Sequence, residues 1–151
     1  IQTVANPLPG IRKALVIAGS DRRGAAYGLF TLSELIGVSP WYWWADVPVK
    51  KHAALHVDAP PTYSQTPSVR YRGIFLNDED WGLTPWASQT FEPERGNIGP
   101  RTYAKVCELL LRLKANYLAP AMHPVSTSFN QIPENKLVAD TFAIVMGSTH
   151  C

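Results

Sequence analysis

Asp78 and Glu79 are adjacent carboxylates that directly follow an apolar stretch, and they are the residues of this chain best suited to acid–base chemistry. Carboxylates act as general acids or bases in glycoside hydrolysis, or they orient a sugar hydroxyl. Because neighbours on a strand point to opposite faces, spacing alone does not bring both groups into one cavity. A solvated acidic turn therefore stands beside the catalytic interpretation.

An asparagine and two histidines occupy equivalent places in the second half of the chain. Asn77 opens the acidic stretch, His123 follows a second apolar segment, and His150 follows a third. Histidine titrates near neutral pH and can bind or move a proton, although a single histidine often only stabilises a turn. We interpret the shared position of these residues, each at an expected strand end, as the sign of a ligand site.

Tryptophans could contribute a second kind of binding. Trp81 lies just past the acidic stretch, where its ring could stack on the apolar face of a sugar or pack against another part of the protein. Residues 41–44 hold three further tryptophans. For that cluster we favour packing, since a tryptophan side chain buries a large apolar area.

The segment Gly19–Gly24 joins an apolar run to a helix-like pattern and carries Arg22 and Arg23. The start of a helix is a natural anion site, which two arginines would strengthen. The segment has neither the glycine–lysine pattern of a P-loop nor the three-glycine pattern of a dinucleotide-binding fold. We expect a plain turn in which Ser20 or Asp21 caps the helix, with a nucleotide-binding α/β domain as the alternative.

The elements that would position these residues follow from the spacing of apolar side chains. The expected strands cover 13–18, 55–57, 69–76, 117–122 and 142–146. The first expected helix follows the turn at 19–24 and ends before Gly37, and two more cover 100–114 and 133–140, with a long loop at 80–100. Pro100 suits a first helical position, Gly37 suits a helix end, and Arg112 and Lys114 suit the last turn of a helix. The strand–helix alternation after residue 69 predicts parallel strands, and such sheets bind ligands at the carboxyl ends of their strands.

The composition is that of a folded chain, with 151 residues, 46% of them hydrophobic and 17% charged. A net charge of +2 argues against a dedicated nucleic-acid binder, and no apolar run is long enough to cross a membrane. The two cysteines form no disulfide framework or zinc-binding pattern, and Cys107 is expected to be a buried thiol. We expect no metal and no cofactor.

Several strings of residues occur in an order that is specific to one family. They are Trp41-Tyr42-Trp43-Trp44-Ala45-Asp46-Val47-Pro48, Leu76-Asn77-Asp78-Glu79, Pro120-Ala121-Met122-His123 and Ile144-Val145-Met146-Gly147. With them the chain resembles glycoside hydrolase family 115 over nearly its whole length. The resemblance implies an α-glucuronidase that removes glucuronic acid, or its 4-O-methyl ether, from glucuronoxylan with inversion.

The resemblance also implies the architecture, an α/β fold in two parts joined near a proline-rich linker at 58–68. Residues 1–62 would be the C-terminal part of an N-terminal α/β domain. Residues 63–151 would be the first β/α units of an incomplete (β/α)8 TIM barrel, so we expect a fragment of a longer parent that is inactive alone. Ala119 departs from the family, which has a tryptophan there, and this changes the expected pocket wall.

The resemblance implies that Asp78 and Glu79 are catalytic and that Asn77 holds sugar hydroxyls. The other expected substrate-binding residues are Arg23, Trp81, His123 and His150. The expected partner is the polysaccharide or oligosaccharide substrate, with no nucleic acid and no membrane. A homodimeric parent and a secreted or periplasmic location are further expectations, and a non-catalytic carbohydrate-binding module is the alternative function.

Overall fold

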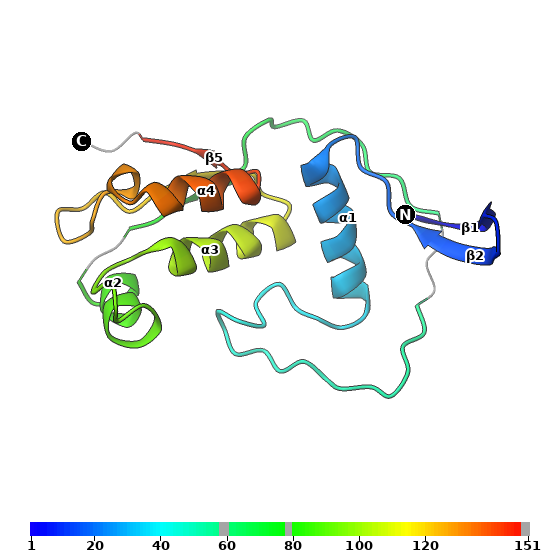
Figure 1. Cartoon of the computed structure of the whole chain (residues 1–151), viewed down its shortest axis with the longest axis horizontal. Coiled ribbons are helices and arrows are strands. Elements are labelled where there is room, and N and C mark those ends of the chain that lie inside the picture. The colour runs from blue at the N-terminus through cyan, green and yellow to red at the C-terminus, as the bar shows by residue number, and fades with distance from the viewer. Residues whose placement is uncertain (58–60, 78–79, 149–151) are drawn as a thin grey trace. The chain divides into compact units, whose positions relative to one another are not determined.

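The computed structural model of the chain describes residues 1–57, 61–77 and 80–148 (Figure 1). The chain divides into two compact units, Ile1–Arg70 and Tyr71–Cys151. This division falls on the C-terminal side of the proline-rich linker, and the domain boundary expected between residues 62 and 63 stays a prediction. Among the described residues, no helix is both long and apolar enough to cross a membrane.

The first unit begins with a hairpin in which β1 (Gln2–Leu8) pairs antiparallel with β2 (Ile11–Val16). The strand expected at 13–18 therefore exists, but it starts and ends earlier in the chain. Its continuous apolar run predicts a buried strand, which is wrong, because its sheet has one other strand and most of its side chains are exposed. The apolar pattern does not predict β1. This strand is irregular, because Asn6 has a φ of +50° and the pairing register with β2 shifts beside it.

Helix α1 (Arg22–Leu35) has the two ends that its sequence predicts. The carboxylate of Asp21 caps the start by accepting a hydrogen bond from the backbone N–H of Gly24, at 2.6 Å. Gly37 follows the end with a φ of +93°, a backbone conformation that glycine adopts without strain. The strand expected at 55–57 does not form.

The second unit contains a parallel sheet with strand order β3-β4-β5. Its strands are β3 (Gly73–Phe75), β4 (Tyr117–Ala119) and β5 (Val145–Met146). Each is shorter than its apolar run, because only two or three residues of each run pair with a neighbour. The chain is thus a mixed α/β protein, and the expected alternation of parallel strands and helices is confirmed.

The connections of this sheet are α3 (Pro100–Arg112), after β3, and α4 (Pro133–Thr141), preceded by a short 3-10 turn, η2 (Phe129–Gln131). Figure 1 shows α3 and α4 side by side, and residues of the two helices contact each other. The core of the unit lies between these helices and β4, where Tyr103 packs edge-on against Phe129 with ring centroids 4.8 Å apart. Lys114 lies past the end of α3 with a φ of +61°, so its expected place in the last turn is wrong.

The loop expected at 80–100 contains helical structure. A short helix, α2 (Leu83–Trp86), continues into a π-helical turn, η1 (Ala87–Phe91). The rings of Trp86 and Phe91 are stacked, with centroids 4.9 Å apart and planes 14° apart. A π-helical turn brings residues five apart to the same side, which fits the stacking of Trp86 on Phe91. The sequence pattern favours an irregular loop here and does not predict this turn.

Cys107 is the buried thiol that its helical pattern predicts, with 1% of its surface exposed. Burial raises the pKa of this thiol to about 12. Above pH 9 the unfolded chain therefore loses a proton that the folded chain keeps, and stability falls as the pH rises.

We expect the difference in unfolding free energy between the natural chain and Cys107→Ala to shrink by about 1 kcal/mol from pH 7 to pH 10. Urea denaturation of both proteins at the two pH values measures it. A difference that does not depend on pH would contradict this assignment.

Candidate functional site

The three parallel strands bring three segments of the second unit to one edge of the sheet. Phe75 pairs with Ala119, and the backbone N–H of Leu76 donates to the carbonyl of Ala119 at 2.9 Å. On the other side of β4, the backbone N–H of Gly147 donates to the carbonyl of Leu118 at 2.8 Å. The chain therefore leaves all three strands at the same edge. We call it the carboxyl edge, and its residues are Asn77, 120–123 and 147–148.

Three of the predicted substrate-binding residues lie in the described part of this unit. Asn77 is exposed at the carboxyl edge, directly after β3. His123 is exposed at the same edge, and its carbonyl accepts a hydrogen bond from the backbone N–H of Ser126 at 2.8 Å. Trp81 precedes α2 and exposes 84% of its surface, so its ring is accessible to a ligand.

The structure brings Asn77 and His123 to one edge of the sheet. It does not place the remaining predicted site residues at that edge. Asp78, Glu79 and His150 lie outside the described residues. Arg23 belongs to the other compact unit, where it lies in the first turn of α1. The catalytic and substrate-binding roles of all these residues therefore stay predictions.

Asn97 is a residue that the sequence pattern did not single out, although it links two loops of the site. Its amide nitrogen donates to the carbonyl of Val125 at 3.1 Å, and its oxygen accepts from the backbone N–H of Thr127 at 3.2 Å. The same oxygen accepts from the backbone N–H of Ile98 at 2.8 Å. One side chain thus holds the loop that carries His123 against the segment before α3.

Glu92 was also not singled out, and it fixes the start of α3. Its carboxylate is 1% exposed and accepts hydrogen bonds from the backbone N–H groups of Gly99, Arg101 and Thr102, at 2.8 to 3.0 Å. The hydroxyl of Thr102 donates a further bond at 2.6 Å. With all four bonds made within the fold, Glu92 is a structural carboxylate that caps a helix.

The turn Gly19–Gly24 is the plain helix cap that we favoured. The Asp21 carboxylate accepts the bond from the Gly24 N–H, and the Asp21 carbonyl accepts from the N–H of Ala25 at 3.0 Å. Gly19 passes so close that a Cβ on it would lie 2.0 Å from the nitrogen of Ala25. The Asp21 carboxylate already accepts from a backbone N–H at this helix start, which favours the plain cap over the nucleotide alternative.

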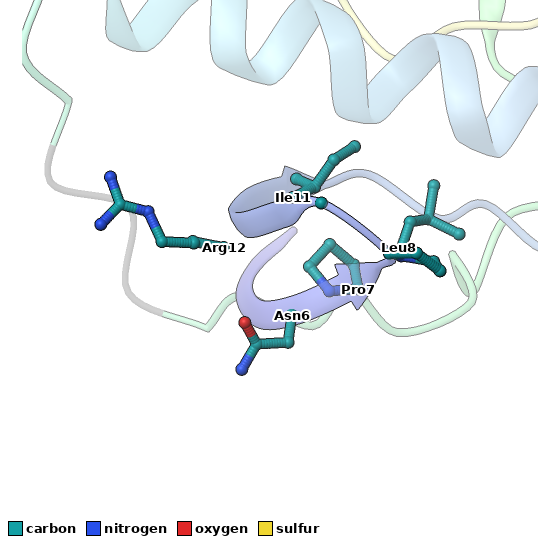
Figure 2. A pocket seen from close by; sticks show the side chains of 7 residues that line it. Asn6, Pro7, Leu8, Ile11 and Arg12 are labelled. Carbon is teal, nitrogen blue, oxygen red and sulfur yellow. The ribbon is translucent and has the colours of Figure 1, made fainter.

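A hollow of about 430 Å³ lies over the β1–β2 hairpin, lined by residues 6–12 (Figure 2). The lining comes from one hairpin and includes neither a carboxylate nor a histidine, so it offers no acid–base chemistry. Within the described residues, no cluster of three or more His, Cys, Asp or Glu could hold a metal ion.

Comparisons with known proteins place the chain in a family. The model of glycosyl hydrolase family 115 matches residues 64–151. One similar solved structure is of a protein described as a family GH115 4-O-methyl-α-glucuronidase with specificity for decorated arabinogalactans; the two share 50% sequence identity, with a TM-score of 0.80. The match covers 89% of this chain but 18% of that protein, and no curated protein matches. With more than half of its residues matched by the family model, the chain belongs to glycosyl hydrolase family 115.

Proposed function

We propose that this chain is part of an α-glucuronidase that hydrolyses the bond between a glucuronic acid, or its 4-O-methyl ether, and a polysaccharide. The observation that carries the proposal is the carboxyl edge, where the segment starting at Asn77 follows the first of three consecutive parallel strands. Enzymes with (β/α)8 barrels place their catalytic residues at this end of the strands. Family membership supplies the reaction class, glycoside hydrolysis.

In the proposed architecture, β3, β4 and β5 are the first three strands of the (β/α)8 barrel. Residues 1–62 then close the preceding α/β domain. The parent is a longer, secreted or periplasmic enzyme that acts as a homodimer. The strand order supports the barrel, since each strand pairs in parallel with the next strand along the chain.

Asp78 and Glu79 have the side chains for the acid–base step, and we assign one of them to it. An inverting glycosidase needs an acid and a base about 6.5–9.5 Å apart, with room for a water molecule. Since neighbours on an extended strand point to opposite faces, we do not expect two consecutive residues to supply both roles. The second carboxylate therefore comes from another strand of the barrel, and Asn77 orients a hydroxyl of the sugar.

Two substrates fit this chemistry. The family resemblance favours glucuronoxylan, while the similar solved structure is of an enzyme specific for decorated arabinogalactans. Both polysaccharides can carry the same uronosyl group, so the proposal is made for that group, with glucuronoxylan as the first choice.

The full-length protein is expected to release 4-O-methylglucuronic acid from glucuronoxylan, and decorated arabinogalactan is the comparison substrate. Proton NMR of the fresh product tests inversion through its anomeric configuration. Comparing the release of uronic acid by Asp78→Ala and by Glu79→Ala identifies which of the two carboxylates is catalytic. Glu94→Ala, an exposed carboxylate paired with Arg101, is the control that should keep full activity.

Release that is unaffected by both Asp78→Ala and Glu79→Ala would refute the assigned role. A protein that binds the polysaccharides but releases no uronic acid would favour the carbohydrate-binding alternative. The exposed ring of Trp81 is the feature that would serve such a module.

A further inference from the structure

Tyr117 has a side chain that reaches from β4 across the neighbouring strand. Its Cα pairs with Val145 of β5. Two residues further along, a Cβ on Gly147 would lie 1.7 Å from the hydroxyl oxygen of Tyr117 and 2.4 Å from its Cζ. The end of the tyrosine ring thus occupies the space that any side chain at position 147 would need.

This arrangement carries the hydroxyl of Tyr117 to the carboxyl edge. β5 ends at Met146, so a group above Gly147 lies past the last paired residue of that strand. Tyr117 itself is the first residue of β4, at the opposite end of the sheet. The ring therefore runs diagonally toward the edge where Asn77 and His123 leave the sheet.

The hydroxyl lies on the less covered face of the sheet. Leu118, which points to the other face, is fully buried, whereas Tyr117 keeps partial exposure. The next residue of β4 on the face of Tyr117 is Ala119, which carries only a methyl group. Among the described residues, the ring of Tyr117 contacts Tyr71, at 6.3 Å between centroids, and its hydroxyl makes no hydrogen bond.

We propose that Tyr117 is a substrate-binding residue whose hydroxyl donates a hydrogen bond to an oxygen of the bound uronosyl group. Gly147 is the residue that gives the ring room to reach this position. A phenol can donate and accept at once, and a bond that it donates to a carboxylate is stronger than one between neutral groups. The inference rests on the proposed function, because it takes the uronosyl group as the ligand of the carboxyl edge.

The test compares Tyr117→Phe with Tyr71→Phe in the full-length protein. Both changes remove one hydroxyl and keep the ring, and the two rings are neighbours, so Tyr71→Phe is a matched control. For Tyr117→Phe we expect the KM for the uronosyl polysaccharide to rise about tenfold, the usual effect of one lost hydrogen bond to a charged group. Its kcat and its melting temperature should stay close to those of the unchanged protein. Tyr71→Phe should change none of these values.

The possible results distinguish a failure of the role proposed for Tyr117 from a failure of the proposed function. If the unchanged protein releases uronic acid and Tyr117→Phe leaves KM as it was, the inference is overturned and the proposed function remains. An equal rise of KM in both variants would show a loss of packing, which also overturns it. If the unchanged protein releases no uronic acid from either polysaccharide, the proposed function fails and the inference fails with it. Gly147→Ala should displace the ring and raise KM in the same way, but the conclusion depends on Tyr117→Phe, which keeps the fold.

Discussion

Replacing Glu92 by alanine is expected to lower the free energy of unfolding of the second unit by about 4 kcal/mol. The buried carboxylate accepts bonds from three backbone N–H groups and from the hydroxyl of Thr102. Alanine would leave these donors without an acceptor, and each unsatisfied buried donor costs about 1–3 kcal/mol. The negative charge that favours the start of α3 would be lost as well.

Amide hydrogen exchange measures this effect where it occurs. A loss of about 4 kcal/mol corresponds to roughly a thousandfold faster exchange of buried α3 amides such as those of Val106 and Leu110. Glu92→Gln should have a smaller effect, because its amide oxygen can still accept some of the bonds. The control is Glu94→Ala, two residues away, where the exposed carboxylate pairs with Arg101 on the surface. Equal exchange rates in Glu92→Ala and Glu94→Ala would show that the buried cap does not hold the helix.

The cap at Glu92 illustrates what the sequence pattern could not predict. The bonds of this carboxylate join residues 7 to 10 positions apart, across a loop whose path has no periodic signal. Asn97 is a stronger case, since its bonds to Val125 and Thr127 join residues 28 and 30 positions apart. Local spacing predicts helices and strands, but the pairing of a single polar side chain with a distant loop depends on the tertiary fold.

The elements with local signals were predicted well. The spacing of Tyr103, Val106, Leu110 and Leu113 predicts one apolar face for α3. The structure buries the first three, while Leu113, just past the end of the helix, stays 42% exposed. Pro100 at the start of that helix and Gly37 after α1 marked helix ends correctly. The parallel sheet followed from the alternation of such elements, and with it the edge shared by Asn77 and His123.

Strand lengths were overestimated for a physical reason. A run such as 69–76 favours extended backbone, but it does not report burial, because the side chains of β3 are all exposed. Its regular pairing with β4 covers Gly73–Phe75, and backbone groups of Arg72 and Leu76 continue the hydrogen bonds at either end. The hairpin strand β2 behaves likewise, since it pairs along its length while most of its side chains stay exposed. Apolar character and pairing are separate properties, and the sequence pattern reports only the first.

Replacing Gly73 by alanine is expected to destabilise the parallel sheet by about 3 kcal/mol. A Cβ at this position would lie 1.7 Å from the carbonyl oxygen of Tyr117 and 2.5 Å from its carbonyl carbon. These are backbone atoms of the neighbouring strand, so the clash cannot be relieved by rotating a side chain. The two strands would have to separate where the carbonyl of Arg72 accepts bonds from the N–H groups of Asn116 and Tyr117, at 2.7 and 3.0 Å.

The amides of Tyr117 and Leu76 report this separation directly, because both donate across the β3–β4 pair. We expect their hydrogen exchange to quicken by about a hundredfold in Gly73→Ala, as a cost of about 3 kcal/mol implies. Ile74→Ala is the control, since it makes a change to alanine in the same strand at a side chain that is already 42% exposed. It should cost about 1 kcal/mol and leave the strand pairing intact. If Gly73→Ala exchanged no faster than Ile74→Ala, the close approach of β3 to β4 would not require glycine. β3 and β5 flank Tyr117 on either side of β4, so the binding role proposed for Tyr117 implies that Gly73→Ala would also weaken binding of the uronosyl group.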